Sequence, residues 1–392
     1  MRGWGDRIPE EENMAEVFDR TVVNGLVLSN RFVRSATWEG LAAPGGYGTE
    51  ELGRLWRRLA RGNVGLIITG HAYVSPEGQA APAQLGIHTD GHVPSLKEMV
   101  DQVHTAGGKI AVQVSHGGRY GLKLPGAVRI GPSTLESKGE VQCKEMTEEE
   151  IHKAVTQFAA AARRAKSASF DAIQIHAAHS YLLSEFLSPF FNKRTDAYGG
   201  PVSQRAAFLL EVVRAVRKEV GEKFPVLVKL NSQDFLEGGF TVEEMLEVAF
   251  LLGDASVDAI EMSGGHHVEG IFGQFFPARK GRPKGEEKPY YLDEARRYKE
   301  KVQAPLMLVG GIRSLEWARR VVSEGIADYV SLCRPLIREP GLIDRWKSGD
   351  TAKSACVSDN DCFNPALKGE GVCCTAAAKQ TDKNLRSAHD KG

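Results

Sequence analysis

Two histidines and a tyrosine lie within six residues of the sequence, where their side chains could act together on one substrate. They are His176, His179 and Tyr181, and they directly follow the apolar run 171–175. If that run is a buried strand of an α/β protein, all three side chains lie at its C-terminal end, where such proteins build active sites. Two imidazole donors beside a phenol can polarise a carbonyl oxygen and protonate a nearby carbon. The sequence therefore predicts reduction of an electron-poor double bond.

A His-x-x-His pair can also bind a metal ion. A catalytic zinc normally has three protein ligands, and no third ligand lies at a recognised spacing from His176 and His179. The pattern therefore favours hydrogen bonding to a carbonyl oxygen over metal binding.

Eight short apolar runs, typical of buried parallel strands, alternate with helical segments. The predicted strands cover residues 32–36, 64–69, 109–114, 171–175, 225–230, 258–262, 305–309 and 328–332. Capping-box patterns at Thr147 and Thr241 predict two helix starts, and a third helix, 203–220, ends at Gly221. This alternation favours a (β/α)8 TIM barrel over a doubly wound sheet.

The barrel is expected to occupy residues 18–350, as a single domain without internal repeats. An N-terminal tail, 1–17, precedes it and a cysteine-containing C-terminal extension, 351–392, follows. Small and polar residues dominate the extension, so we expect 375–392 to be mostly disordered.

Loops at both ends of the barrel are also predicted. An Asn24-Gly25 turn predicts a hairpin over residues 21–28 that plugs the N-terminal mouth. Two long irregular inserts, 117–144 and 264–288, would lie over the C-terminal face as substrate loops.

Composition excludes several classes of protein. Lys+Arg and Asp+Glu each number 50, so the formal net charge is zero, which argues against nucleic-acid and membrane-surface binding. The N-terminus lacks the apolar core of a signal peptide, and no run approaches the ~18 apolar residues of a membrane span. Six cysteines do not form a secreted disulfide framework. We expect a soluble cytoplasmic protein and leave open whether it forms a homo-oligomer.

The segment 176–200 resembles the signature of the old yellow enzyme family of FMN-dependent ene-reductases. It contains His-Ala-Ala-His-x-Tyr-Leu, Phe-Leu-Ser-Pro and Asn-x-Arg-Thr-Asp-x-Tyr-Gly-Gly in that order, and the resemblance extends over residues 18–346. It implies hydride transfer from flavin N5 to the β-carbon of an α,β-unsaturated carbonyl compound. His176 and His179 would bind the carbonyl oxygen, and Tyr181 would protonate the α-carbon.

The resemblance also implies an FMN site at other strand ends. Ser35, Ala36 and Thr37 would contact the isoalloxazine ring, Gln113 would bond to its pyrimidine edge, and Lys229 would lie near N1. Ala36 departs from the family's frequent Pro, and Lys229 from its frequent Arg. A buried lysine without a partner is costly, and the flavin would supply that partner.

The phosphate of FMN would lie after the seventh and eighth strands. Gly310-Gly311 and Cys333-Arg334 follow them, and backbone N–H groups there would hold the anion together with the Arg334 side chain. No Gly-x-Gly-x-x-Gly follows a strand, so NAD(P)H would bind only transiently as the hydride donor. Ping-pong kinetics are expected.

The substrate class stays open between several molecules. The cationic run 279–284 is either a solvated loop or a clamp for the phosphates of NADPH or of a CoA thioester. Alternatives to a free enone are therefore a dienoyl- or cyclic enoyl-CoA thioester, a quinone or a nitro compound. A flavin-binding scaffold without turnover is a further alternative, but it would not need the His-His-Tyr set.

Cysteines in the extension resemble those of larger relatives, similar to bacterial dienoyl-CoA reductase, that hold a [4Fe–4S] cluster. Cys356, Cys362 and Cys374 are the candidate ligands here, but Asp359 stands at the second ligand position. Cluster sites normally use four cysteine thiolates, so the sequence favours a loop with free thiols over a working cluster.

Overall fold

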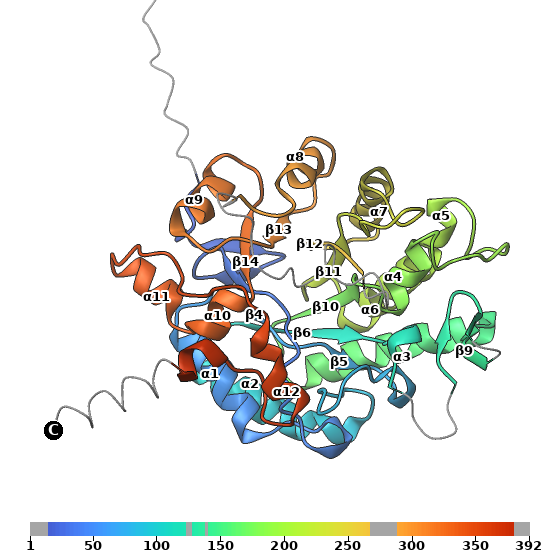
Figure 1. The fold of residues 1–392 in the computed structure, drawn as a ribbon, viewed down its shortest axis with the longest axis horizontal. Helices are drawn as coiled ribbons and strands as arrows, with labels where there is room; N and C mark the ends of the chain where they lie inside the picture. Colours follow the sequence, from blue (N-terminus) through green and yellow to red (C-terminus); the bar gives the residue numbers. More distant parts are fainter. Residues whose placement is uncertain (1–14, 123–127, 138–139, 267–287, 380–392) are drawn as a thin grey trace, which may run out of the picture.

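The computed structural model describes residues 15–122, 128–137, 140–266 and 288–379. Over these residues, parallel strands close into a barrel with helices packed around it, the predicted (β/α)8 fold (Figure 1). The barrel strands are β3 (Phe32–Arg34), β4 (Leu66–Ile68), β6 (Ile110–Ser115), β10 (Ala172–Ala177), β11 (Val226–Asn231), β12 (Ala259–Ser263), β13 (Leu306–Val309) and β14 (Tyr329–Leu332). Parallel pairing of β6 with β10 and of β14 with β3 closes the ring.

Helices lie between the strands and after the last strand, β14, and most of them pack around the outside of the barrel (Figure 1). They are α1 (Glu50–Arg61), α2 (Val93–Thr105), α3 (Glu148–Ser167), α4 (Leu182–Leu187), α5 (Val202–Arg205), α6 (Ala207–Val220), α7 (Val242–Asp254), α8 (Leu292–Lys301), α9 (Leu315–Ser323), α10 (Arg334–Arg338), α11 (Leu342–Lys347) and α12 (Asn364–Leu367). The predicted capping boxes at Thr147 and Thr241 both form. The helix expected over 203–220 is instead two helices, because Ala206, with ψ −13°, departs from α geometry between α5 and α6.

A hairpin closes the N-terminal end of the barrel, as the Asn24-Gly25 turn predicts. Its strands, β1 (Thr21–Val23) and β2 (Leu26–Leu28), pair antiparallel. Val23 and Leu28 pack against the inward-facing side chains at the base of the barrel. This end is therefore filled by apolar side chains.

Part of the insert 117–144 is regular, which corrects the expectation of an irregular loop. It contains β7 (Ile130–Gly131), β8 (Leu135–Ser137) and β9 (Glu140–Glu145), which form a small sheet. Outside this insert, the short strand β5 (Ala72–Tyr73) pairs with β6. Leu135 pairs with Cys143, whose side chain is buried, so one face of this small sheet packs against the protein. The second insert, 264–288, lies almost entirely outside the described residues, as does most of 375–392.

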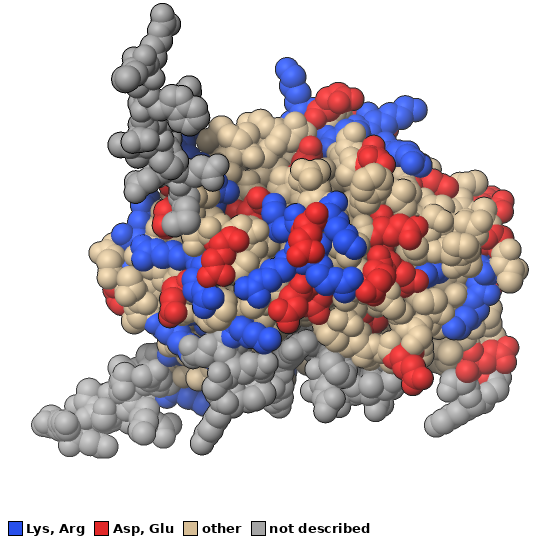
Figure 2. Space-filling view, turned by 90° about the horizontal axis from the view of Figure 1, so that it is seen from above, with Lys and Arg blue, Asp and Glu red and all other residues tan. Residues whose placement is uncertain are grey.

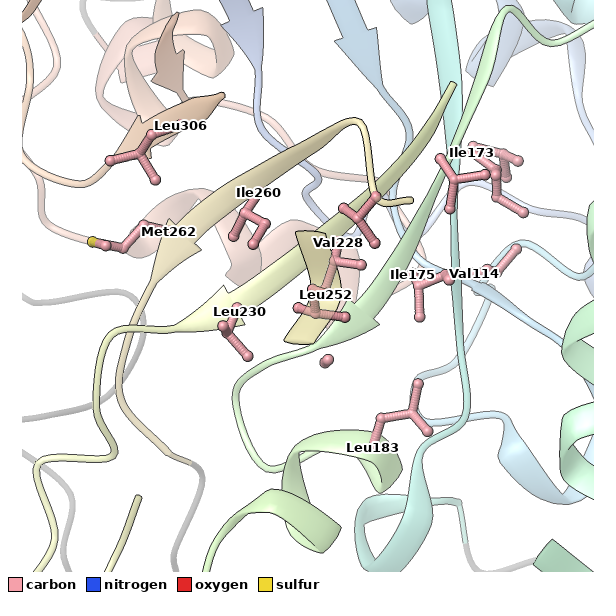
Figure 3. Packing of buried hydrophobic residues seen from close by; sticks show 14 of the residues in the cluster. Val114, Ile173, Ile175, Leu183, Val228, Leu230, Leu252, Ile260, Met262 and Leu306 are labelled. Atoms are coloured by element: carbon pink, nitrogen blue, oxygen red, sulfur yellow. The ribbon is translucent and has the colours of Figure 1, made fainter. Parts of the chain in front are cut away.

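Side chains alternate between two environments along each barrel strand. Ile175, Val228 and Ile260 face the surrounding helices, where Leu252 of α7 lies beside them (Figure 3). The intervening residues face inward and are apolar near the hairpin but polar at the C-terminal end, where Gln113, Gln174, Lys229 and Glu261 are all buried. The polar site is thus built at one end of the barrel only.

Acidic and basic side chains are interspersed on the face in Figure 2, in keeping with a formal net charge of zero. Among the described helices, none combines the length and apolarity needed to cross a membrane.

Candidate active site

One cavity of about 550 Å³ lies at the C-terminal ends of the barrel strands. All the predicted substrate- and FMN-binding residues line it: Ser35, Ala36, Thr37, Gln113, His176, His179, Tyr181, Lys229, Gly310, Gly311, Cys333 and Arg334. These residues come from six of the eight strand ends and are separated by up to about 300 positions in the sequence. The fold therefore brings the predicted set together, while the role of each residue stays a prediction.

The two histidines and the tyrosine form one aromatic group at the end of β10. The His176 ring lies 4.6 Å from the Tyr181 ring and 5.4 Å from the His179 ring, centroid to centroid. His179 has a positive φ of 61°, and its backbone N–H donates to Asn231 Oδ1 at 3.2 Å. Its Nε2 lies 2.7 Å from Ser263 Oγ. Neighbouring strands β11 and β12 thus hold the turn that carries His179.

Tyr181 contacts a residue that the sequence analysis missed. Its Oη lies 3.3 Å from Nε2 of His71, which follows β4. Burial raises the pKa of Tyr181, so the phenol keeps its proton at neutral pH, as a general acid must. His71 lies just after the second barrel strand, so the strand-end rule that singled out His176, His179 and Tyr181 could have found it too.

A hydrogen-bonded network forms the floor of the cavity. Lys229 Nζ donates to Ser35 Oγ at 2.8 Å and to Glu261 Oε2 at 2.9 Å. Gln174 Nε2 also donates to Glu261 Oε2, at 3.1 Å, and Gln113 Nε2 donates to Gln174 Oε1 at 2.6 Å. The floor therefore presents polar groups of fixed position to whatever fills the cavity.

The expectation that a flavin must supply the partner of Lys229 is wrong. The register of β11 and β12 pairs Lys229 with Glu261, so the ammonium already has a carboxylate beside it. Burial alone would raise the pKa of Glu261, but the Lys229 charge and the hydrogen bonds outweigh it, and the pKa lies below its ordinary value. Glu261 was missed because it looks like a single polar residue in an apolar run.

The residues predicted to hold phosphate line the same cavity. Gly310 and Gly311 have φ values of 110° and 79°, and a Cβ on Gly310 would lie 3.0 Å from the Tyr291 ring. Arg334 Nη1 donates to Asn360 Oδ1 at 2.6 Å. The Cys333 thiol lies 3.1 Å from Thr37 Oγ1, which links the ends of β14 and β3. At Gly310, only glycine permits a positive φ so close to the Tyr291 ring.

The C-terminal extension forms part of the cavity wall. Its contribution was not predicted from the sequence and consists of Ser358, Asn360, Phe363 and Leu367. Cys362, Ala366 and Val372 pack with Trp38, Leu55 and Ile337, which anchors this segment to the barrel. The described part of the extension is therefore folded onto the site.

No group of three or more His, Cys, Asp or Glu side chains is placed to hold a metal ion within the described residues. Cys374 Sγ lies 3.8 Å from Arg338 Nη1 and lines a different, smaller cavity from the one described above. Burial raises the pKa of Cys362 to about 12, which disfavours its thiolate. The cationic run 279–284 lies outside the described residues.

The chemistry of the main cavity fits FMN. Lys229, Gln113 and Ser35 offer polar side chains to it, and Gly310 and Gly311 line it with their backbone. Ser331 Oγ lines the cavity, is buried and has no hydrogen-bond partner among the described residues. A buried hydroxyl of this kind normally has a partner, which a bound ligand can supply.

Comparison with known proteins gives the family. The model of the NADH:flavin oxidoreductase / NADH oxidase family matches residues 17–352. The NADH oxidase of Thermoanaerobacter brockii is 34% identical over 88% of this chain and 52% of its own length. The chain spans about half the length of longer relatives of this kind.

Solved structures agree with the family. 2-Naphthoyl-CoA reductase with 2-naphthoyl-CoA superposes with a TM-score of 0.84 at 27% identity, over 92% of this chain and 56% of its own. The old yellow enzyme homologue from Zymomonas mobilis superposes with a TM-score of 0.73 at 27% identity, over 88% and 96%. The resemblance seen in segment 176–200 is confirmed. The chain belongs to the NADH:flavin oxidoreductase / NADH oxidase family of FMN-dependent oxidoreductases.

Proposed function

We propose that the protein reduces the C=C bond of α,β-unsaturated carbonyl compounds with NAD(P)H as the electron source. The observation that carries this proposal is the convergence of His176, His179 and Tyr181 on one cavity with Lys229 and Gln113. FMN, held by residues such as Ser35, Gln113, Lys229 and Arg334, would supply the hydride-transfer chemistry.

The two histidines bind the carbonyl oxygen of the substrate. A hydrogen bond from each imidazole stabilises the negative charge that develops on this oxygen as the β-carbon is reduced. Ser263 Oγ lies 2.7 Å from His179 Nε2, and this hydrogen bond holds the ring in place. A hydroxyl can donate or accept, so the bond can form with either tautomer of His179.

Tyr181 protonates the α-carbon. Burial raises its pKa, so the proton is present at neutral pH and moves only to a strongly basic enolate-like carbon.

Stopped-flow spectroscopy of the two half-reactions tests this proposal. We expect Tyr181→Phe to slow reoxidation by 2-cyclohexen-1-one by about 100-fold, while reduction by NAD(P)H changes by less than about twofold. Tyr298→Phe is the matched control, because Tyr298 is buried and donates to Ala304 O away from the cavity. Equal losses in both half-reactions would contradict the role of Tyr181.

A CoA thioester is the second candidate substrate, favoured by the similarity to 2-naphthoyl-CoA reductase over 92% of the chain. A cyclic enoyl-CoA would present the same conjugated carbonyl to the histidines. Reoxidation by the thioester much faster than by the free enone would establish this class. Neutralising the cations of 279–284 then tests whether they clamp the CoA phosphates.

A further inference from the structure

The contact between Tyr181 and His71 has a third member, Gln84. His71 lines the cavity and is 8% exposed, whereas Gln84 is 1% exposed and does not line it. Gln84 Nε2 lies 2.6 Å from His71 Nδ1 and 3.0 Å from the His71 carbonyl oxygen. The three side chains thus form the chain Gln84–His71–Tyr181.

Gln84 fixes which nitrogen of His71 carries the proton. Its Oε1 accepts hydrogen bonds from the backbone N–H groups of Ala80 and Ala81, at 2.7 and 3.1 Å. These two donors assign the oxygen end of the amide, so the nitrogen end faces His71. An amide nitrogen only donates, which makes His71 Nδ1 the acceptor and places the proton of the neutral ring on Nε2.

His71 therefore donates to Tyr181 and does not take the phenol's proton. The Nε2–H points to Tyr181 Oη at 3.3 Å, and the rings lie 5.1 Å apart. Facing this pair are Ser115, whose Oγ lies 3.4 Å from His71 Nδ1, and the His176 ring. A protonated His71 would turn an N–H toward the Gln84 amide donor, so the imidazolium form is disfavoured.

We propose that His71, oriented by Gln84, is a positioning residue that aims Tyr181 and stabilises its phenolate. This rests on the proposed function, in which Tyr181 gives its proton to the α-carbon. In that step the Oη–H bond breaks, the α-carbon–H bond forms, and the electron pair stays on Oη. The hydrogen bond from His71 Nε2–H strengthens as Oη becomes negative, which lowers the barrier to proton transfer.

Three variants of the holoenzyme change this bond in different ways. His71→Leu removes the donor, and His71→Gln keeps an amide donor near the position of Nε2. In Gln84→Glu, one carboxylate oxygen still accepts from the Ala80 and Ala81 N–H groups. The other oxygen can only accept, so it favours the His71 tautomer that carries its proton on Nδ1. Gln79→Glu is the matched control, since it makes the same change in the same loop, and Gln79 bonds to Ala81 O instead of His71.

We expect His71→Leu and Gln84→Glu to slow reoxidation by 2-cyclohexen-1-one at least about tenfold, with partial rescue in His71→Gln. Reduction by NAD(P)H should stay within about twofold in all variants. In a Tyr181→Phe background His71→Leu should have no further effect, because its role passes through Tyr181. Full-rate reoxidation in His71→Leu, or an undiminished effect without the Tyr181 hydroxyl, would overturn the proposal.

The tautomer can be measured without turnover. In ¹⁵N NMR spectra of holoenzyme labelled with ¹⁵N-histidine, the signals that disappear in His71→Leu belong to His71. We expect these signals to show a neutral ring protonated at Nε2. In Gln84→Glu they should show the proton on Nδ1. A wild-type Nδ1–H or imidazolium form would overturn the inference. A harmless Tyr181→Phe overturns the proposed function and this role with it, whereas a harmful Tyr181→Phe beside a harmless His71→Leu overturns this inference alone.

Discussion

Lys229 Nζ lies 2.9 Å from Glu261 Oε2 in the floor of the cavity, and both side chains are buried, at 4% and 0% exposure. The pairing follows from the parallel register of β11 and β12, which sets the two residues side by side. A buried pair of this kind is costly to break from either side, because the remaining charge loses its partner. The floor therefore carries a balanced ion pair in place of a lone cation.

Glu261→Gln should raise the midpoint potential of bound FMN. The variant leaves Lys229 uncompensated, and an unbalanced cation favours the added negative charge of reduced flavin. We expect a rise of at least about 30 mV, which corresponds to about 1.4 kcal/mol for a two-electron couple. Anaerobic titration against a reference dye measures it.

Glu185→Gln is the control for this potential. Glu185 is fully buried and does not line the cavity, and burial raises the pKa of its carboxyl well above the ordinary value. Its amide variant should leave the potential unchanged. A lower potential in Glu261→Gln would contradict the role given to the ion pair.

Stability should fall as the pH falls from about 6.5 to about 4, in part because of His116. Burial lowers the pKa of His116 to about 4, with a smaller opposing effect of Glu77. The unfolded chain binds a proton below about pH 6.5 while the folded chain does not, so acid favours unfolding. His116→Asn should remove roughly 2–3 kcal/mol of this loss between pH 7.5 and 4.5, measured by urea unfolding.

Asn is chosen because the His116 Nδ1 accepts from Gly118 N–H at 3.0 Å, and the Asn oxygen can take over that bond. A variant whose unfolding free energy keeps the wild-type slope between these two pH values would show that other groups carry the effect.

Asn360→Ala should weaken FMN binding. Asn360 Oδ1 accepts from Arg334 Nη1, so its loss removes one of the hydrogen bonds that hold the guanidinium that is predicted to meet the phosphate. Loss of one such bond corresponds to about 1 kcal/mol, or a roughly fivefold increase in Kd. Titration of the apoprotein with FMN, followed by quenching of flavin fluorescence, gives the value. Lys368→Ala, an exposed change in the same segment, should bind FMN as the wild type does.

Iron should be substoichiometric after anaerobic purification. Cys356, Cys362 and Cys374 are not assembled with a fourth ligand among the described residues, and Cys374 lies at a separate cavity. Four thiolates are the usual requirement for a [4Fe–4S] cluster. Iron and acid-labile sulfide analysis decides the matter, and four of each per chain would restore the cluster hypothesis.

The sequence by itself determined the barrel, because apolar runs alternating with capped helices leave few ways to bury both faces of each strand. It also indicated where the site lies, since parallel strands in a closed barrel carry their C-terminal residues to one end, and this rule singled out His176, His179 and Tyr181. Ser35, Gln113, Lys229 and Arg334 were added by the resemblance to the old yellow enzyme family.

Only the tertiary structure decided which of these residues touch. Glu261 beside Lys229 depends on strand register, and a shift of two residues would separate them without changing either strand's pattern. His71 beneath Tyr181 and Asn360 beside Arg334 join segments 110 and 26 residues apart. Such contacts are set by packing between distant segments, which local propensity and spacing do not encode. The chemistry of His176, His179 and Tyr181 could therefore be predicted from the sequence, whereas their hydrogen-bond partners are set by the fold.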